Sequence, residues 1–166
     1  METASPCLHT TVAACQDRAK EASARLAKAL GFVPDGKLLW SPSPTSRSAL
    51  ALVGHCILGN RMFARVLRGE ALPQLSTPEQ GEAMSRQFEA TLTERADAER
   101  QLEASCAEVV AALGTMTAER FATSPDSPFG AFPMAFWMNL PALHQDSHTA
   151  QLEYLQTIWG DLAHHR

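Results

Sequence analysis

A chain of 166 residues fits one domain, and we expect residues 1–166 to form a single one. Its hydrophobic fraction of 45% and charged fraction of 19% are those of a globular protein that buries its own core. The net charge of −4 and the lack of a Lys/Arg run argue against a nucleic-acid-binding surface.

The first predicted helix covers about residues 8–30, a stretch rich in Ala, Lys, Arg and Glu. Its apolar residues recur at helical spacing, and Gly31 is a natural end. A long linker, 31–47, follows with a Pro34-Asp35-Gly36 turn. We expect Leu39 and Trp40 of this linker to pack against the helices.

A second helix is predicted to begin at Ser46 or Ser48, either of which can cap it, and to end near residues 67–68 before Gly69. Thr77-Pro78-Glu79-Gln80 is another start signal with capping-box spacing. The helical pattern then runs to Gly114, which would give a helix of roughly 54 Å. Because that is long for a compact bundle, we expect a short helix and a break near residues 85–90.

Residues 117–121 favour one further helical turn, and 122–133 form a loop rich in Ser and Pro. The last helix is predicted from about Pro133 to Gly160, with a kink at Pro141. Alternating strand patterns and Asn-Gly turns are missing. These elements predict an all-α fold, an antiparallel four-helix bundle with a long packed linker between its first two helices.

No stretch reaches the roughly 20 apolar residues of a membrane span, and residues 1–11 lack the features of a signal peptide. The cysteines form no C-x-x-C pair and are widely spaced, which favours reduced thiols and a cytoplasmic location. They are Cys7, Cys15, Cys56 and Cys106.

Histidines carry the strongest functional signal. His144 and His148 are four residues apart in the last helix, so both rings lie on one face, and that face is otherwise apolar. Such a pair can bind one metal ion, although many such pairs are simply hydrogen-bonded histidines. His55 lies on the apolar face of the second helix and can meet them. Burying three imidazoles without a ligand is costly, so the pattern predicts a divalent-metal site at His55, His144 and His148 with an open coordination position.

Several nearby residues allow two interpretations. Ala51 and Gly59 flank His55 and either leave room beside an ion or allow close helix packing. Gln151 either orients a ligand ring or has no role. Arg47 either binds a substrate carboxylate or is solvated. The aromatic residues Phe129, Phe132, Phe136 and Trp137 either line a substrate pocket or pack on the core.

Other candidates are excluded from the site by spacing or position. Asp146 and Glu153 lie off the ligand face, so no general base is identified. Cys56 points away from His55 and is interpreted as a small core residue. His9 and the C-terminal His164 and His165 are not counted as ligands.

The sequence resembles the DinB-like metal-binding superfamily over most of its length. The stretch 39–48 is similar to the family's lead-in to its second helix, and Gly54-His55-Cys56-Ile57 stands where the family has its first ligand. Residues 63–69 look like the family's helix end. The most specific match is 144–155, which is similar to the closing H-x-x-x-H-x-x-Q-L motif.

This resemblance implies a four-helix bundle, often a homodimer, that binds zinc, nickel or a similar ion through three histidines; iron or manganese are further options. It also implies a small-molecule substrate and favours a metal-bound small thiol that attacks an electrophile, the chemistry of thiol S-transferases and isomerases. A metal-dependent hydrolase, and a non-enzymatic bundle stabilised by its metal or dimer, remain open at this stage.

Overall fold

The computed structural model describes residues 6–73, 77–127, 130–163 and 165, and in these residues all regular structure is helical. The long helices are α1 (Pro6–Gly31), α2 (Ala49–Leu67), α4 (Arg95–Gly114) and α6 (Met134–Ile158). Shorter ones are the 3-10 turn η1 (Asp35–Lys37), α3 (Pro78–Glu89) and α5 (Ala118–Phe121). The predicted all-α class is therefore confirmed.

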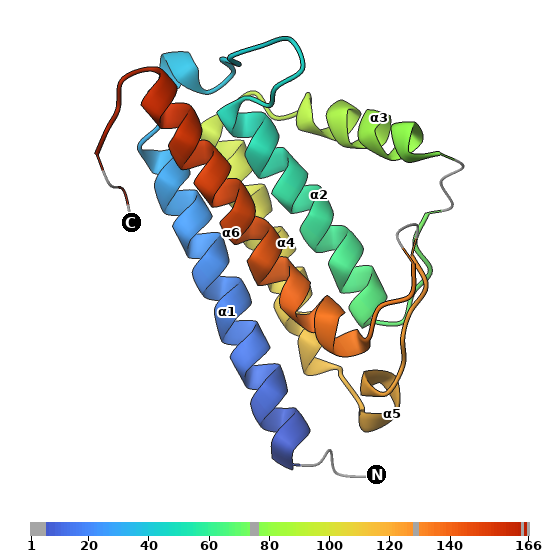
Figure 1. Cartoon of the computed structure of the whole chain (residues 1–166). Helices are drawn as coiled ribbons and strands as arrows, with labels where there is room; N and C mark the ends of the chain where they lie inside the picture. The colour runs from blue at the N-terminus through green and yellow to red at the C-terminus, as the bar shows by residue number, and fades with distance from the viewer. Residues whose placement is uncertain (1–5, 74–76, 128–129, 164, 166) are drawn as a thin grey trace.

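The four long helices pack side by side as a bundle (Figure 1), in which α2 contacts α4, α1 contacts both α4 and α6, and α2 also contacts α6. Helices α1 and α6 run in one direction and α2 and α4 in the other, so the bundle consists of two parallel pairs that are antiparallel to each other. The reason is α3, which lies outside the bundle against α2 and returns the chain to the end where α2 began.

Helix ends follow the capping signals of the sequence. The Ser48 hydroxyl accepts the backbone N–H of Ala51 at the start of α2, and Thr77 does the same for Gln80 at the start of α3. Gly69 follows α2 with a φ of 77°, a conformation that favours glycine. The predicted break is present, but it falls at residues 90–94, just after the expected 85–90, because α3 continues through Glu89.

The linker packs on the bundle through a different leucine from the one expected. Leu38 is buried, whereas Leu39 is 61% exposed, so the prediction for Leu39 was wrong. The turn at η1 directs Leu38 inward, and its carbonyl accepts the backbone N–H of Leu50. Trp40 is half-buried and meets Trp159 edge to face, as its predicted packing requires.

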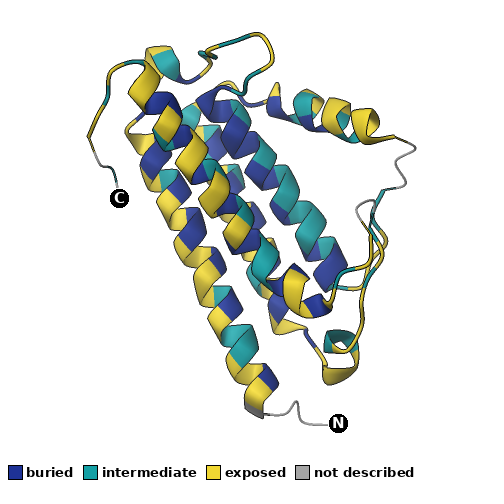
Figure 2. Cartoon of the chain, in the orientation of Figure 1, coloured by how far each residue is buried: buried dark blue, intermediate teal, exposed yellow. Residues whose placement is uncertain are grey.

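The buried residues line the inside of the bundle along its whole length (Figure 2). Helix α2 alone is long and apolar enough to pass for a membrane span among the described helices, but 56% of its apolar window is buried inside the bundle. Pro141 is buried within α6, which passes through it without interruption. None of the four cysteines forms a disulfide, and all but Cys7 are buried.

Candidate functional site

Three histidines converge between α2 and α6. One ring nitrogen from each of His55, His144 and His148 lies within 4.8 Å of the other two. The ring centroids of His144 and His148 are 4.5 Å apart, and that of His55 is 5.0 and 4.7 Å from them. The structure thus brings together the three side chains that the spacing singled out.

The remaining histidines lie apart from this cluster. His9 is an exposed residue of α1, and His165 stacks on Phe32 and pairs with Asp161. His164 lies outside the described residues. The positions of His9 and His165 are consistent with their exclusion from the site.

Hydrogen bonds on the outer side of two rings leave their inner nitrogens available. The Nδ1 atom of His55 is 3.0 Å from the Ser85 hydroxyl, and that of His148 is 2.7 Å from Gln151 Oε1. The Nε2 atoms of His144 and His148 are 3.2 Å apart. Two nitrogens bound to one tetrahedral zinc ion at about 2.0–2.1 Å would lie about 3.3 Å apart. The contact of Gln151 with His148 favours the interpretation that this residue orients a ring of the cluster.

The environment keeps the α6 pair neutral. Burial, followed by the neighbouring His148 and His55 rings, lowers the pKa of His144 to about 3. Burial also lowers the pKa of His148, although its hydrogen bond to Gln151 acts in the opposite direction. The buried Nδ1 atom of His144 has no hydrogen-bond partner among the described residues. Neutral imidazoles are the form that binds a metal, so the donor set fits a divalent ion.

Gly59 makes room for the His144 ring. A Cβ atom at this position would lie 2.9 Å from Cε1 and 3.2 Å from Nδ1 of His144. The His144 ring thus occupies the space that the missing side chain leaves on α2. Gly59 was expected either to leave room beside an ion or to allow close helix packing. The structure agrees with close packing, and the group that packs against Gly59 is the His144 ring.

A third helix, α3, also reaches the site, which the sequence pattern did not predict. Glu89 of α3 is only 3% exposed, and its Oε1 atom is 3.4 Å from His55 Nδ1. Arg47 Nε donates to the same oxygen at 2.8 Å, and the Ser85 hydroxyl donates to it at 2.7 Å. Burial alone would raise the pKa of Glu89, but hydrogen bonds from His55, Ser85 and Arg47 lower it to about 2.

Arg47 consequently has a role that neither sequence interpretation included. Besides Glu89 it binds both carboxylate oxygens of Glu82, each at 3.0 Å, so its guanidinium is paired rather than solvated or open to a substrate. The available signal was the i, i+4 spacing of Ser85 and Glu89, which places both on one face of α3. Nothing in the sequence says that this face meets α2.

Two other candidates behave as structural residues. Asp146 is bound by Arg25 of α1 through both carboxylate oxygens, on the side of α6 away from the histidines. Cys56 is fully buried, and burial raises the pKa of its thiol far above the ordinary range. Both positions agree with their exclusion from the predicted site.

The aromatic residues before the ligand pair contact one another. Phe132 and Phe136 stack at 4.7 Å, and Trp137 is buried with Phe132 packed on its cluster. These contacts favour core packing over a substrate pocket. Phe129 lies outside the described residues.

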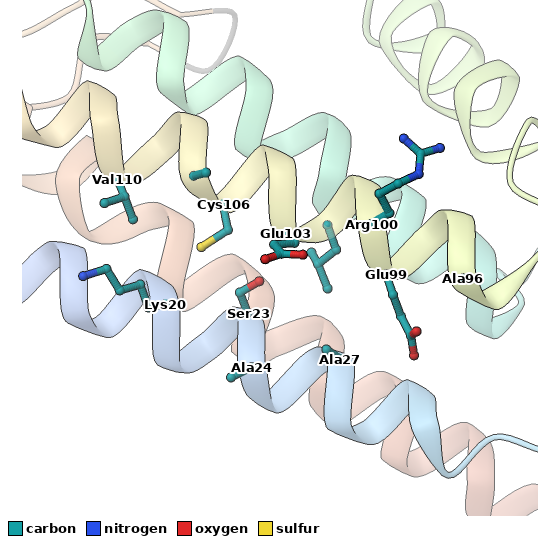
Figure 3. Close-up of a pocket in the computed structure, with 12 residues that line it drawn as sticks. Lys20, Ser23, Ala24, Ala27, Ala96, Glu99, Arg100, Glu103, Cys106 and Val110 are labelled. Atoms are coloured by element: carbon teal, nitrogen blue, oxygen red, sulfur yellow. The ribbon is translucent and has the colours of Figure 1, made fainter.

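A groove of about 700 Å³ lies on the opposite side of the bundle, between α1 and α4 (Figure 3). Its lining includes Ser23, Cys106 and several alanines, and none of the histidines. The candidate site is therefore the histidine cluster between α2 and α6, and not this groove.

Comparison with known proteins agrees with this geometry. A family model described as the DinB superfamily matches residues 18–152. The chain belongs to this superfamily. The resemblance inferred from the histidine motif is thus confirmed, and so is its helical fold. A search of curated protein sequences finds no match.

Two solved proteins illustrate the fold. A mycothiol-dependent maleylpyruvate isomerase is 14% identical with a TM-score of 0.68, over 85% of this chain and 60% of that one, so this chain spans about three fifths of the isomerase. A histidine-to-alanine mutant of the isomerase is 13% identical with a TM-score of 0.70 and the same coverage. The colibactin self-resistance protein ClbS, solved with double-stranded DNA, is 12% identical with a TM-score of 0.65, over 86% of this chain and 94% of that one.

Proposed function

We propose that this protein binds one divalent metal ion through His55, His144 and His148 and uses it to transfer a small thiol to an electrophilic substrate. The observation that carries the proposal is the convergence of three imidazole nitrogens within 4.8 Å from two helices. The 3.2 Å approach of the Nε2 atoms of His144 and His148 supports it, because a metal gives these inner nitrogens a common partner.

Three protein ligands leave a tetrahedral or larger coordination shell incomplete. Glu89, the nearest carboxylate, faces the outer nitrogen of His55 and is bound by Arg47, so it is not free to serve as a fourth ligand. A bound ion would supply the positive charge that keeps a thiol deprotonated at neutral pH. Zinc and nickel both suit imidazole ligands, and iron or manganese are the further choices.

The thiol is proposed from a relative and not from this chain's own residues. The similar maleylpyruvate isomerase is mycothiol-dependent, and a low-molecular-weight thiol is the corresponding cofactor proposed here. We also propose that residues 1–166 form a single domain, that the protein is cytoplasmic and that it forms a homodimer. A metal-dependent hydrolase uses the same open position, with water in place of the thiol.

DNA binding is the second candidate raised by the comparisons, since ClbS was solved with double-stranded DNA. The net charge of −4 and the pairing of Arg47 and Arg25 with carboxylates argue against phosphate binding at the described faces. We therefore propose a small-molecule substrate and no nucleic-acid partner. A gel-shift experiment with duplex DNA at low salt, showing no complex, is the expected result.

The first experiment is elemental analysis of tag-free protein purified without added metal, alongside His55→Ala. We expect about one ion per chain in the wild type and none in the variant, with helical content retained by circular dichroism. The matched control is His9→Ala, an exposed histidine outside the cluster, which should keep its metal. Retained tight metal in His55→Ala would contradict the ligand assignment.

The role of the metal is tested next by chelation. We expect the chelated protein to stay folded and to regain thiol-transfer activity when zinc or nickel is restored. Unfolding on chelation would favour the structural-metal alternative. Hydrolysis without a thiol requirement would favour the hydrolase. Wild-type protein that takes up no metal even from added zinc or nickel would contradict the proposal.

A further inference from the structure

Helix α3 carries two buried polar side chains to the outer nitrogen of His55. Ser85 and Glu89 are 6% and 3% exposed and lie on one face of the helix. Gly54 of α2 permits the approach, because a Cβ there would lie 3.2 Å from the Cα of Glu89 and 3.0 Å from Leu92 Cδ1. Helix α3 packs mainly on α2, and this contact lies within that interface.

For a neutral His55 ring, the hydrogen bonds in this group allow one arrangement of protons. Glu89 Oε1 accepts a hydrogen bond from Arg47 Nε, and a carboxylate can only accept. In the 2.7 Å contact between Ser85 and Glu89, the Ser85 hydroxyl must therefore be the donor, which uses its single hydrogen. The Ser85 oxygen, 3.0 Å from His55 Nδ1, is then left to accept. The hydrogen of the neutral His55 ring therefore sits on Nδ1, and its Nε2 carries a bare lone pair.

We propose that Ser85 and Glu89 are positioning residues that hold His55 in the Nδ1–H tautomer and present Nε2 to the metal. This inference rests on the proposed metal binding, since it explains how one ligand is prepared for it. Carboxylates that accept the outer N–H of a ligating histidine fix its orientation and raise its basicity. Arg47 holds the carboxylate in place through the same oxygen, so the direct contact of α3 with the histidine cluster is at His55.

The test compares zinc affinity, by competition with a chromophoric chelator, in three variants of α3. Glu89→Met keeps the length of the side chain but removes the acceptor, and we expect a loss of about 10–100-fold. Glu89→Gln keeps an oxygen for the hydroxyl and should lose less than about 10-fold. The matched control is Glu82→Met on the same helix, which also binds Arg47 but not His55, and it should stay within about twofold.

Nitrogen-15 NMR of the imidazole rings in metal-free protein gives a readout that does not depend on metal. We expect the Nδ1–H tautomer at His55 in the wild type and in Glu89→Gln, and the Nε2–H form to appear in Glu89→Met. An Nε2–H tautomer in the wild type would overturn the inference, and so would equal losses of zinc affinity in the Glu89 and Glu82 variants. If Glu89→Met does not fold, the wild-type tautomer and Glu89→Gln decide the question.

The two proposals fail in different ways. Wild-type protein that binds neither zinc nor nickel contradicts the proposed function, while the tautomer of His55 still tests the role of Ser85 and Glu89. Zinc binding with the wrong tautomer contradicts only the positioning role.

Discussion

The two sides of the bundle differ in how the hydrogen bonds of their polar side chains are satisfied. Where α1 and α4 meet, two polar side chains find partners in backbone carbonyls: Gln16 donates to that of Val110, and the Cys106 thiol donates to that of Ala19. Where α2 and α6 meet, imidazole rings face one another, and the nitrogens of His144 have no hydrogen-bond partner besides His148 among the described residues. Glu89, which is the one buried carboxylate among the described residues, also lies on this second side.

This difference separates packing from function. A polar group that bonds to the nearest carbonyl costs little and needs no ligand. A cluster of polar groups whose hydrogen bonds are only partly satisfied within the protein lowers its stability. Such a cluster is therefore expected where a bound ligand or metal satisfies the remaining groups. We therefore propose that a ligand or metal completes the α2–α6 side, even though the clearer groove lies on the α1–α4 side (Figure 3).

The largest expected effect is on zinc affinity, and it comes from adding a methyl group at Gly59, with Gly31 as the control. Gly59→Ala puts a Cβ 2.9 Å from His144 Cε1 and should displace the ring, weakening zinc binding by roughly 10–100-fold. Gly31→Ala at the end of α1 meets no atom within 4 Å. It should leave zinc binding unchanged and stabilise the protein by at most about 1 kcal/mol. Chelator competition and thermal unfolding measure both, and equal zinc affinity in the two variants would show that His144 has room to move.

The histidine cluster was predictable from sequence because periodicity determines which residues share a helix face. His144 and His148 are four residues apart, and the apolar pattern around His55 shows which way it points. Glu89 was not predictable in the same way. Its place at His55 depends on how α3 packs on α2, a contact between segments whose relative position no local pattern states. The directions of α2 and α4 and the burial of Leu38 in place of Leu39 depend on such long-range packing too.

An intermediate effect is expected from pH in metal-free protein. The pKa of His144 falls from 6.5 to about 3 on folding, so below pH 6.5 the unfolded chain binds more protons and stability falls as the pH is lowered. Between pH 7.5 and 5.5 we expect a loss of about 1 kcal/mol from this residue. Glu89, with a folded pKa of about 2 against 4.5, acts in the same direction but only below about pH 4.5.

Denaturant unfolding of the chelated protein at these two pH values measures the loss. His144→Ala should show a flatter dependence, because the buried neutral imidazole is gone. Saturating zinc should keep or steepen the dependence in this range, since a bound metal excludes protons from the folded ligands while the unfolded chain still binds them. A wild-type protein whose stability does not change between pH 7.5 and 5.5 would contradict the buried, neutral state of His144.

The smallest effect is expected on the outer face of α6. Asp146 is two residues from each α6 histidine in sequence, yet its carboxylate binds Arg25 of α1, with both side chains 45% exposed. An exposed pair of this kind contributes at most about 1 kcal/mol, so Asp146→Ala should lower stability slightly and lose that difference in high salt. Zinc affinity should not change, because the carboxylate faces away from the cluster. A variant that lost its metal would place Asp146 in the site after all, and the division of the bundle into a packing side and a ligand side would fail at α6.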